Sequence, residues 1–247
     1  MTRNLEPQLK VLIINHLIAK GLIDKNDTLI NEFNIGDFSR RVDLALIKEN
    51  GIFAYEIKSD GDTLLRLKDQ VDKYLEYFDK VTVITTPRHT QKALLLIPNN
   101  VALLELDDKT NDVRVIKKGK FIKAADKLSM IQLMTMKDLI RVAKENKIII
   151  SNKRTDLEKK ILLLPKNKLR QYTILSLKKR FEKVNILNEE AITSNLFKKQ
   201  IPTNTRNETN IASQLDVLIA NLHKLENELN HQSIHSSSVL KSDTSSK

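Results

Sequence analysis

Three charged side chains stand on two neighbouring apolar segments in the first quarter of the chain. Asp43 lies within RRVDLALI, and Glu56 and Lys58 lie within IFAYEIK. Carboxylates are the oxygen ligands that Mg²⁺ takes in proteins, and charged groups in an apolar setting are costly unless they pair or bind metal. The residue types and their spacing would therefore suit a site for a divalent cation.

The elements that position these residues are predicted to form a β-hairpin. Asn50-Gly51 between apolar runs favours a tight type I′ turn, because that turn needs positive φ at both central residues. A two-residue loop would set Asp43 opposite Lys58 and Ala45 opposite Glu56, with Asp43 and Glu56 as diagonal neighbours. Alternation along the strands predicts a polar face and a buried face. The polar face would hold Asp43, Ala45, Ala54, Glu56 and Lys58, and the buried face Val42, Leu44, Leu46, Phe53, Tyr55 and Ile57.

A simpler interpretation is an ordinary cross-strand ion pair between Asp43 and Lys58 on a solvated face, which would contribute little stability. The next segment favours a site instead. Apolar residues at helical spacing predict a helix over 63–79, beginning near Asp62 or Thr63. Its opposite stripe would present Asp62, Arg66, Gln70 and Lys73, close to the same carboxylates.

This arrangement resembles the PD-(D/E)XK nuclease superfamily, the restriction-endonuclease-like fold. In that family an Asp on one core strand and an (Asp/Glu)-x-Lys on the next bind Mg²⁺ and activate water. The matching residues here are Asp43 and then Glu56-Ile57-Lys58. The family often adds a Glu from an earlier element and a Gln from the following helix, and Glu32 and Gln70 are similar to these. The chain also resembles a group of restriction-endonuclease-like bacterial proteins over roughly residues 1 to 107.

The resemblance implies a role for each residue. Asp43, Glu56 and Glu32 would hold Mg²⁺ or Mn²⁺, which would polarise a scissile phosphate and activate water. Lys58 would orient or deprotonate that water or stabilise developing charge, and neighbouring carboxylates favour the last role. Gln70 would hold the water or a phosphate oxygen. A solvated helix position remains the alternative for Arg66, and a plain strand position for Glu32.

Composition narrows the class of protein. The chain has 247 residues and no cysteine, so disulfides and cysteine-based zinc sites are excluded. The five histidines show no metal-ligand spacing, and no apolar run approaches the roughly 20 residues of a membrane helix. The first residues lack the pattern of a signal peptide. A cytoplasmic protein without membrane contact is expected.

The positive charge is concentrated in the middle of the chain. Residues 117–183 hold 20 Lys and Arg against 6 Asp and Glu, whereas the flanking segments are close to neutral. This density is typical of a protein that binds the phosphate backbone, although an anionic membrane surface or a solvated lysine-rich face would show it too. Few aromatic residues accompany the charges, which favours duplex DNA over stacked single strands. The expected DNA contacts are Arg66, Lys73, Lys153, Arg154, Lys159 and Lys160.

The elements predict an α/β protein with a restriction-endonuclease-like core, a mixed sheet flanked by helices, over residues 1–116. Strands are expected at 28–33, 41–47, 52–58, 81–85, 101–106 and 113–116, with helices at 5–19, 63–79 and 89–96. A basic helical region would follow at 117–200. Within it, residues 135–164 resemble the SAP-type helix–extension–helix module, although the usual glycine after the first helix is replaced by Asn146-Lys147; a plain basic helical subdomain is the alternative.

The last segment has a different composition. Residues 201–247 are rich in Thr, Asn and Ser, as in a linker and a disordered tail. Within 208–230 apolar residues alternate spacings of three and four, which predicts a short coiled-coil-like helix. That helix would either form a homodimer or pack on the body of the protein.

The sequence therefore predicts a Mg²⁺-dependent DNA nuclease that hydrolyses phosphodiester bonds, in defence or repair by family analogy. Two alternatives stay open. One is a non-catalytic DNA-binding or assembly protein that keeps a nuclease-like fold, and the other is an RNA nuclease with the same core.

Overall fold

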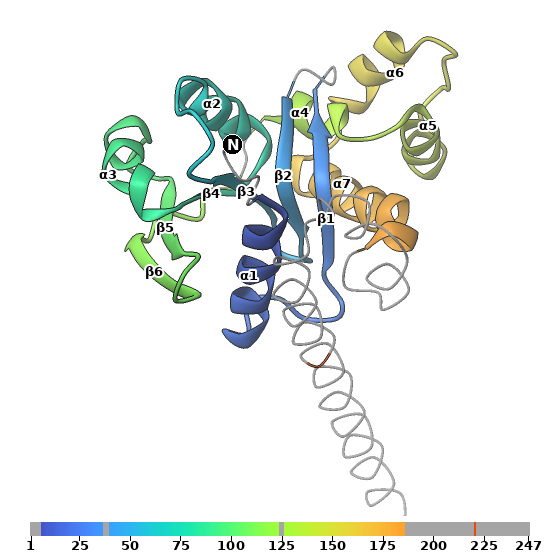
Figure 1. Cartoon of the computed structure of the whole chain (residues 1–247). Helices are drawn as coiled ribbons and strands as arrows, with labels where there is room; N and C mark the ends of the chain where they lie inside the picture. Colours follow the sequence, from blue (N-terminus) through green and yellow to red (C-terminus); the bar gives the residue numbers. More distant parts are fainter. Residues whose placement is uncertain (1–5, 37–39, 124–125, 186–219, 221–247) are drawn as a thin grey trace, which may run out of the picture.

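The computed structural model describes residues 6–36, 40–123 and 126–185, and residue 220. Its centre is a six-stranded mixed sheet in the order β1-β2-β3-β4-β5-β6 (Figure 1). The strands are β1 Thr28–Ile35, β2 Arg40–Ile47, β3 Ile52–Lys58, β4 Lys80–Thr85, β5 Ala102–Asp107 and β6 Asp112–Lys117. The β3-β4 and β4-β5 pairs are parallel and the other three antiparallel. The expected α/β class with a mixed sheet is confirmed.

Helices cover both faces of the sheet. Helix α1 (Glu6–Ala19) packs on one face and, with strand residues such as Leu44 and Tyr55, forms one apolar core. The crossover helices α2 (Leu67–Tyr77) and α3 (Pro87–Leu96) pack on the other face together with α7 (Lys166–Phe181). Parallel neighbours need such crossovers, which is why α2 and α3 separate β3, β4 and β5 along the chain.

The hairpin forms where the sequence predicted it, but its register is different. Leu44 pairs with Tyr55 and Ala45 with Ala54, so Ala45 does not face Glu56, and the ladder ends before Asp43 could face Lys58. No residue of the Lys48–Gly51 loop has positive φ, so the type I′ turn was wrong. Gly51 serves packing instead: a Cβ there would lie 2.8 Å from the ring of Phe121.

The predicted alternation along β1 and β2 also breaks at one point. Glu32 has a φ of 58°, a left-handed conformation that non-glycine residues rarely adopt. The ladder pairs Asn31 with Leu44 and Phe33 with Val42, and Glu32 and Asp43 between them form no pair. Val42 consequently packs in the core beneath α2, with Ala45 and not with Leu44 as predicted. The distortion occurs where two of the predicted site residues stand.

A group of helices follows the sheet. They are α4 (Lys127–Gln132), α5 (Met136–Glu145), α6 (Arg154–Ile161) and α7, followed by the short 3-10 helix η1 (Glu182–Val184). Helices α4 to α6 and the start of α7 enclose a core of their own. The helix–extension–helix pattern predicted for 135–164 is present as α5 and α6. Lys147 takes a φ of 56° at the position where a glycine is usual.

Several polar contacts attach this helical group to the sheet, and two of them involve the buried side chains of Asp79 and Asn185. Arg170 on α7 pairs with the buried carboxylate of Asp79, which also accepts the N–H of Ile52 at 2.7 Å. Asn185 donates to the carbonyl of Asp27 and accepts from the N–H of Leu29. Helix α7 also packs in the core beneath the sheet. The domain boundary predicted between residues 116 and 117 therefore stays a prediction. The predicted linker, coiled-coil-like helix 208–230 and tail lie outside the described residues, apart from residue 220.

Candidate acidic site

A cluster of carboxylates forms at the distortion in β1 and β2. Glu6 comes from the first turn of α1, Glu32 from β1 and Asp43 from β2, and their ligand oxygens all lie within 4.8 Å of one another. Each residue is partly buried. The left-handed backbone at Glu32 accompanies this convergence, and backbone strain of this kind is typical of functional sites.

Two cationic side chains contact the cluster. The ammonium of Lys10 is 2.8 Å from both Glu6 and Glu32, and the guanidinium of Arg41 is 2.6 Å from Glu32. Lys10 is only 2% exposed. Burial opposes its charge, but its hydrogen bonds to Glu32 and Glu6 outweigh burial and raise its pKa. Lys10 is therefore an internal counterion for the cluster.

Glu56 lies next to the cluster and is fully engaged by protein groups. Its Oε1 accepts hydrogen bonds from Lys58 and from Gln70, each at 2.7 Å. Its Oε2 accepts from the hydroxyl of Tyr74 at 2.8 Å. Glu56 is 1% exposed, so these donors replace the water that a carboxylate otherwise requires. Burial and the charge of Glu56 raise the pKa of Tyr74, which keeps its hydroxyl protonated as a donor.

Asp43 is the least compensated of these carboxylates. Its Oδ2 accepts the backbone N–H of Ile57 at 2.7 Å, which replaces a ladder bond where the strands separate. Burial and, second, the neighbouring charge of Glu56 raise the pKa of Asp43 to about 7. The Ile57 hydrogen bond and the charge of Lys10 act in the opposite direction and do not compensate fully.

The predicted site residues do come together. Glu56, Lys58 and Gln70 form one hydrogen-bonded unit, and Asp43 is near enough to Glu56 for their charges to interact. Glu32 joins Asp43 within the carboxylate cluster. Asp62, predicted to start the stripe of α2, instead accepts from the N–H and hydroxyl of Ser59 in the preceding loop. Helix α2 therefore begins later than predicted, at Leu67.

Sequence reasoning missed four members of the site: Glu6, Lys10, Tyr74 and Arg41, which pairs with Glu32. Glu6 and Lys10 are spaced i, i+4 on α1, and nothing in that spacing indicates that they face strands β1 and β2. Tyr74 is one of the apolar residues at helical spacing that predict α2; its ring is buried, and its hydroxyl donates to Glu56. A buried tyrosine needs a partner for its hydroxyl, so a polar target near this position was the available signal.

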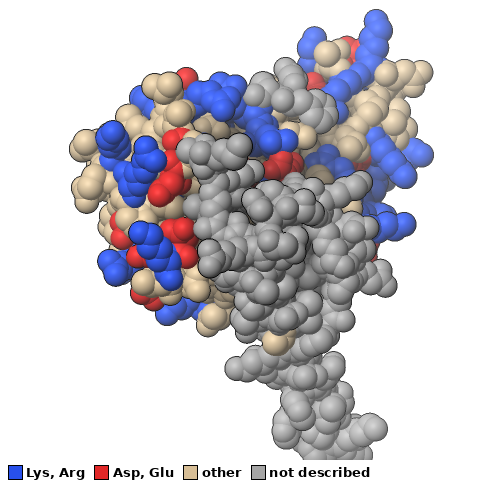
Figure 2. Space-filling view, in the orientation of Figure 1, with Lys and Arg blue, Asp and Glu red and all other residues tan. Residues whose placement is uncertain are grey.

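The predicted nucleic-acid contacts have different environments. Arg66 lies at the N-cap of α2, and Lys73 pairs with Glu76 and stands over the ring of Tyr77. Lys153 and Lys159 are exposed. Arg154 pairs with Glu158 and donates to the carbonyls of Met134 and Ile131, whereas Lys160 donates to the carbonyl of Ile149. Lys and Arg gather on the side of the molecule formed by α5 to α7 (Figure 2).

The chemistry of the donor set fits a divalent cation. Glu6, Glu32, Asp43 and Glu56 bring four carboxylates together, and Lys10, Arg41 and Lys58 pair with three of them, Glu6, Glu32 and Glu56. Burial is the main cause of the raised pKa of Asp43, and the negative charge of Glu56 adds to it. A hard cation with oxygen ligands would balance the remaining negative charge.

Fold and site together define a class: an α/β protein whose mixed sheet carries a buried acidic site with an adjacent lysine. The family profile described as Bacteriophage P4 protein cII matches residues 1–205, and the chain belongs to this family. Protein cII of Enterobacteria phage P4 is 32% identical over 180 residues, which cover 71% of this chain and 67% of that protein.

Two solved structures show weaker likeness. A protein of unknown function from Silicibacter pomeroyi aligns with a TM-score of 0.38 and 21% identity, covering 56% of this chain and 86% of that one. Pyrococcus furiosus SfsA, solved in complex with Ca²⁺, aligns with a TM-score of 0.29 and 14% identity, covering 46% and 64%. None of the helices within the described residues is long and apolar enough to cross a membrane.

Proposed function

We propose that this protein is a metal-dependent nuclease of PD-(D/E)XK type that hydrolyses phosphodiester bonds in DNA. The observation that carries the proposal is the convergence of Asp43, Glu56, Lys58 and Gln70 beside a carboxylate cluster. These residues come from strands β2 and β3 and from the crossover helix α2. They lie beyond the last β2–β3 pair, Leu44 and Tyr55, where Asp43 accepts the N–H of Ile57. Such an arrangement is costly for folding alone.

The chain's own residues would divide the work as follows. Asp43 and Glu32, with Glu6, would hold Mg²⁺ or Mn²⁺, and Glu56 would join them if Lys58 and Gln70 released one of its oxygens. A divalent cation supplies polarisation of the phosphate and activation of water. Asp43 must give up its proton to bind the cation, so metal affinity should rise with pH.

Lys58 and Gln70 would contact the substrate. Both already donate to Glu56 Oε1, so their donor atoms stand at the same place. Lys58 Nζ, held next to a carboxylate, is suited to stabilise negative charge that develops on a phosphate oxygen. Gln70 Nε2 is suited to orient the attacking water or a phosphate oxygen. Tyr74 would keep Glu56 in place from the other oxygen.

One observation supports a second candidate, a DNA-binding protein without catalysis. Lys10 already bridges Glu6 and Glu32, and Glu56 has partners on both oxygens. These contacts stabilise the carboxylates without metal. The charged helices α5 to α7 would then supply the binding activity.

The test is cleavage of supercoiled plasmid and of end-labelled DNA and RNA oligonucleotides in Mg²⁺ or Mn²⁺. Wild type should cut DNA, and EDTA should stop it. Asp43→Ala and Lys58→Ala should each lower the rate at least about 100-fold. Asp108→Asn, a partly exposed carboxylate in the β5–β6 turn, is the matched control and should cut like wild type.

Each outcome has a distinct meaning. Absence of cleavage by wild type, with DNA still retained on the protein, would replace the nuclease proposal with the binding-protein candidate. Faster cleavage of RNA than of DNA would reassign the substrate. Cleavage that persists in Asp43→Ala would place the activity elsewhere.

A further inference from the structure

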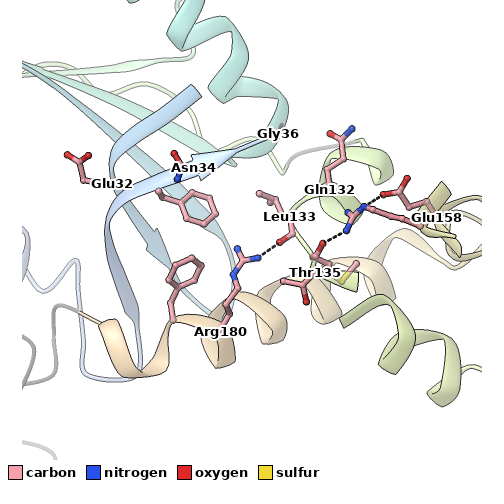
Figure 3. Close-up of a pocket in the computed structure, with 12 residues that line it drawn as sticks. Glu32, Asn34, Gly36, Gln132, Leu133, Thr135, Glu158 and Arg180 are labelled. Carbon is pink, nitrogen blue, oxygen red and sulfur yellow. Dashed lines mark hydrogen bonds and ion pairs between the residues drawn. The ribbon is translucent and has the colours of Figure 1, made fainter. Parts of the chain in front are cut away.

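A cleft of about 810 Å³ lies between strand β1 and the helical group (Figure 3). One wall is the end of β1 from Glu32 to Gly36, and the others are residues 132–135, α6 and the end of α7. Glu32 belongs to both the cleft and the carboxylate cluster. Its carboxylate points away from Arg180. Glu32 therefore connects the cleft to the acidic site.

The two arginines that line the cleft differ in their engagement. Arg154 is occupied by Glu158 and by the carbonyls of Ile131 and Met134. Among the described residues, Arg180 makes one hydrogen bond, to the carbonyl of Leu133 at 3.2 Å, and no ion pair with a carboxylate. A guanidinium has five N–H donors, so most donors of Arg180 remain available to a ligand.

Arg180 is also held in a defined orientation. Its guanidinium carbon is 4.6 Å from the centre of the Phe181 ring, and Phe181 in turn contacts Phe33 edge-on at 5.6 Å. Arg180 itself is exposed. A planar cation fixed on an aromatic ring can bind a phosphate through its edge or stack on a base through its face.

Two amide side chains complete the polar lining. The Oε1 of Gln132 accepts from the hydroxyl of Tyr77 at 2.7 Å, which fixes the amide and leaves its NH₂ donors available. Asn34 is exposed on β1. Amides offer the donor and acceptor pairs that bind base edges. The two acidic residues of the lining, Glu32 and Glu158, are each paired with a cation, which limits their repulsion of a phosphate.

We propose that this cleft binds an unpaired stretch of nucleic acid, with Arg180 as its phosphate contact, and that it leads the strand to the acidic site. This inference rests on the proposed nuclease function, because the acidic site gives the strand its destination. Cavities of this volume hold ligands of small-molecule size, which corresponds to a few nucleotides and not to a duplex.

The proposal revises the duplex preference drawn from the scarcity of aromatic residues. Phe181 stands alone in the sequence among basic residues, but the fold places it beside Phe33 and under Arg180. Phe33 is buried and supports the Phe181 ring, and Phe181 carries the Arg180 guanidinium. The free face of that guanidinium is therefore the surface on which a base can stack, and neither segment shows it by itself.

The test measures binding without catalysis. Fluorescence anisotropy in EDTA would follow a labelled 15-nucleotide single strand and a hairpin duplex of the same sequence, with the full-length protein. Arg180→Gln should weaken single-strand binding about tenfold and reduce the salt dependence by roughly one phosphate contact. Arg180→Lys should recover part of the affinity, since it keeps the charge but loses the planar fork.

Lys109→Gln, an equal charge change in the exposed β5–β6 turn, is the control and should bind like wild type. Unchanged affinity in Arg180→Gln would overturn the proposal, and so would an equal loss in both variants. A loss for duplex as large as that for single strand would overturn the unpaired-strand assignment. If Arg180→Gln loses binding but wild type cuts no nucleic acid in Mg²⁺, the nuclease function fails and the cleft assignment stands.

Discussion

Two aspartates, Asp79 and Asp43, accept backbone hydrogen bonds from opposite ends of strand β3, and the charges around them differ. Asp79 is beside Ile52 at the start of the strand, is 2% exposed, and accepts from Ile52 and from both terminal nitrogens of Arg170. Asp43 is beside Ile57 near the end, accepts one backbone N–H, and faces other carboxylates.

The comparison shows how burial of the same side chain can serve two purposes. Around Asp79 every charge has an opposite partner, so the group attaches α7 to the hairpin. Around Asp43 negative charge is in excess, so the group is costly in the absence of a cation. Balanced charge indicates a structural contact, and unbalanced charge indicates a binding site.

The largest effect is expected from removing the partner of the balanced aspartate. Arg170→Met would leave the Asp79 carboxylate buried without its cation, and should lower the free energy of unfolding by about 4 kcal/mol. Urea unfolding at pH 7 measures this. The matched control is Lys68→Met, which breaks the exposed Lys68–Asp72 pair and should leave the stability close to that of wild type. Similar losses in the two variants would remove the distinction between the sites.

The next effect concerns the counterion of the unbalanced cluster. Lys10→Met should lower the free energy of unfolding by about 3 kcal/mol, because Glu6 and Glu32 lose their buried ammonium. Millimolar Mg²⁺ should then raise the melting temperature of the variant more than that of wild type, since a cation stabilises the state that binds it. An equal Mg²⁺ response in both proteins would argue against a cation site at this cluster.

Asp43→Asn should have the opposite sign from Arg170→Met. Folded Asp43 keeps its proton up to about pH 7, whereas an unfolded aspartate loses it near 4. Folding therefore takes up a proton between these values, and this residue's contribution to stability falls as pH rises from 4 to 7. Metal-free Asp43→Asn should be more stable than wild type by on the order of 2 kcal/mol at pH 8 and by less at pH 5. Urea unfolding in EDTA at both pH values checks this; a pH-independent difference would contradict it.

The smallest effect separates two tyrosines of α2. Tyr74→Phe removes the hydroxyl donor to Glu56 and should cost about 1.5 kcal/mol, because the lost bond is to a buried charged acceptor. Tyr77→Phe removes a bond to the neutral amide of Gln132 and should cost about 0.5 kcal/mol. Parallel urea unfolding of both variants compares them, and equal losses would show that Glu56 does not depend on Tyr74.

Much of the fold was predictable, because apolar periodicity and chain breaks are local properties. All six strands and the helices α1, α2 and α3 lie close to their predicted ranges. The hairpin was correct in position and wrong in register, because Gly51 accommodates Phe121, seventy residues later, and is not required for a left-handed turn. Glu56 keeps its predicted face because a shift of two residues preserves alternation, whereas the irregularity at Asp43 breaks the alternation of β2.

The sequence by itself determined the types of the reacting groups, their strands and the concentration of positive charge in residues 117–183. Only the tertiary structure decided that Glu6 and Lys10 of α1 meet Glu32 and Asp43, and that Tyr74 holds Glu56. It also decided that Arg154 pairs with Glu158, whereas Arg180 lies over Phe181 with donors available to a ligand. The physical reason is that charge balance and burial depend on groups distant in the sequence, which patterns of neighbouring residues do not encode.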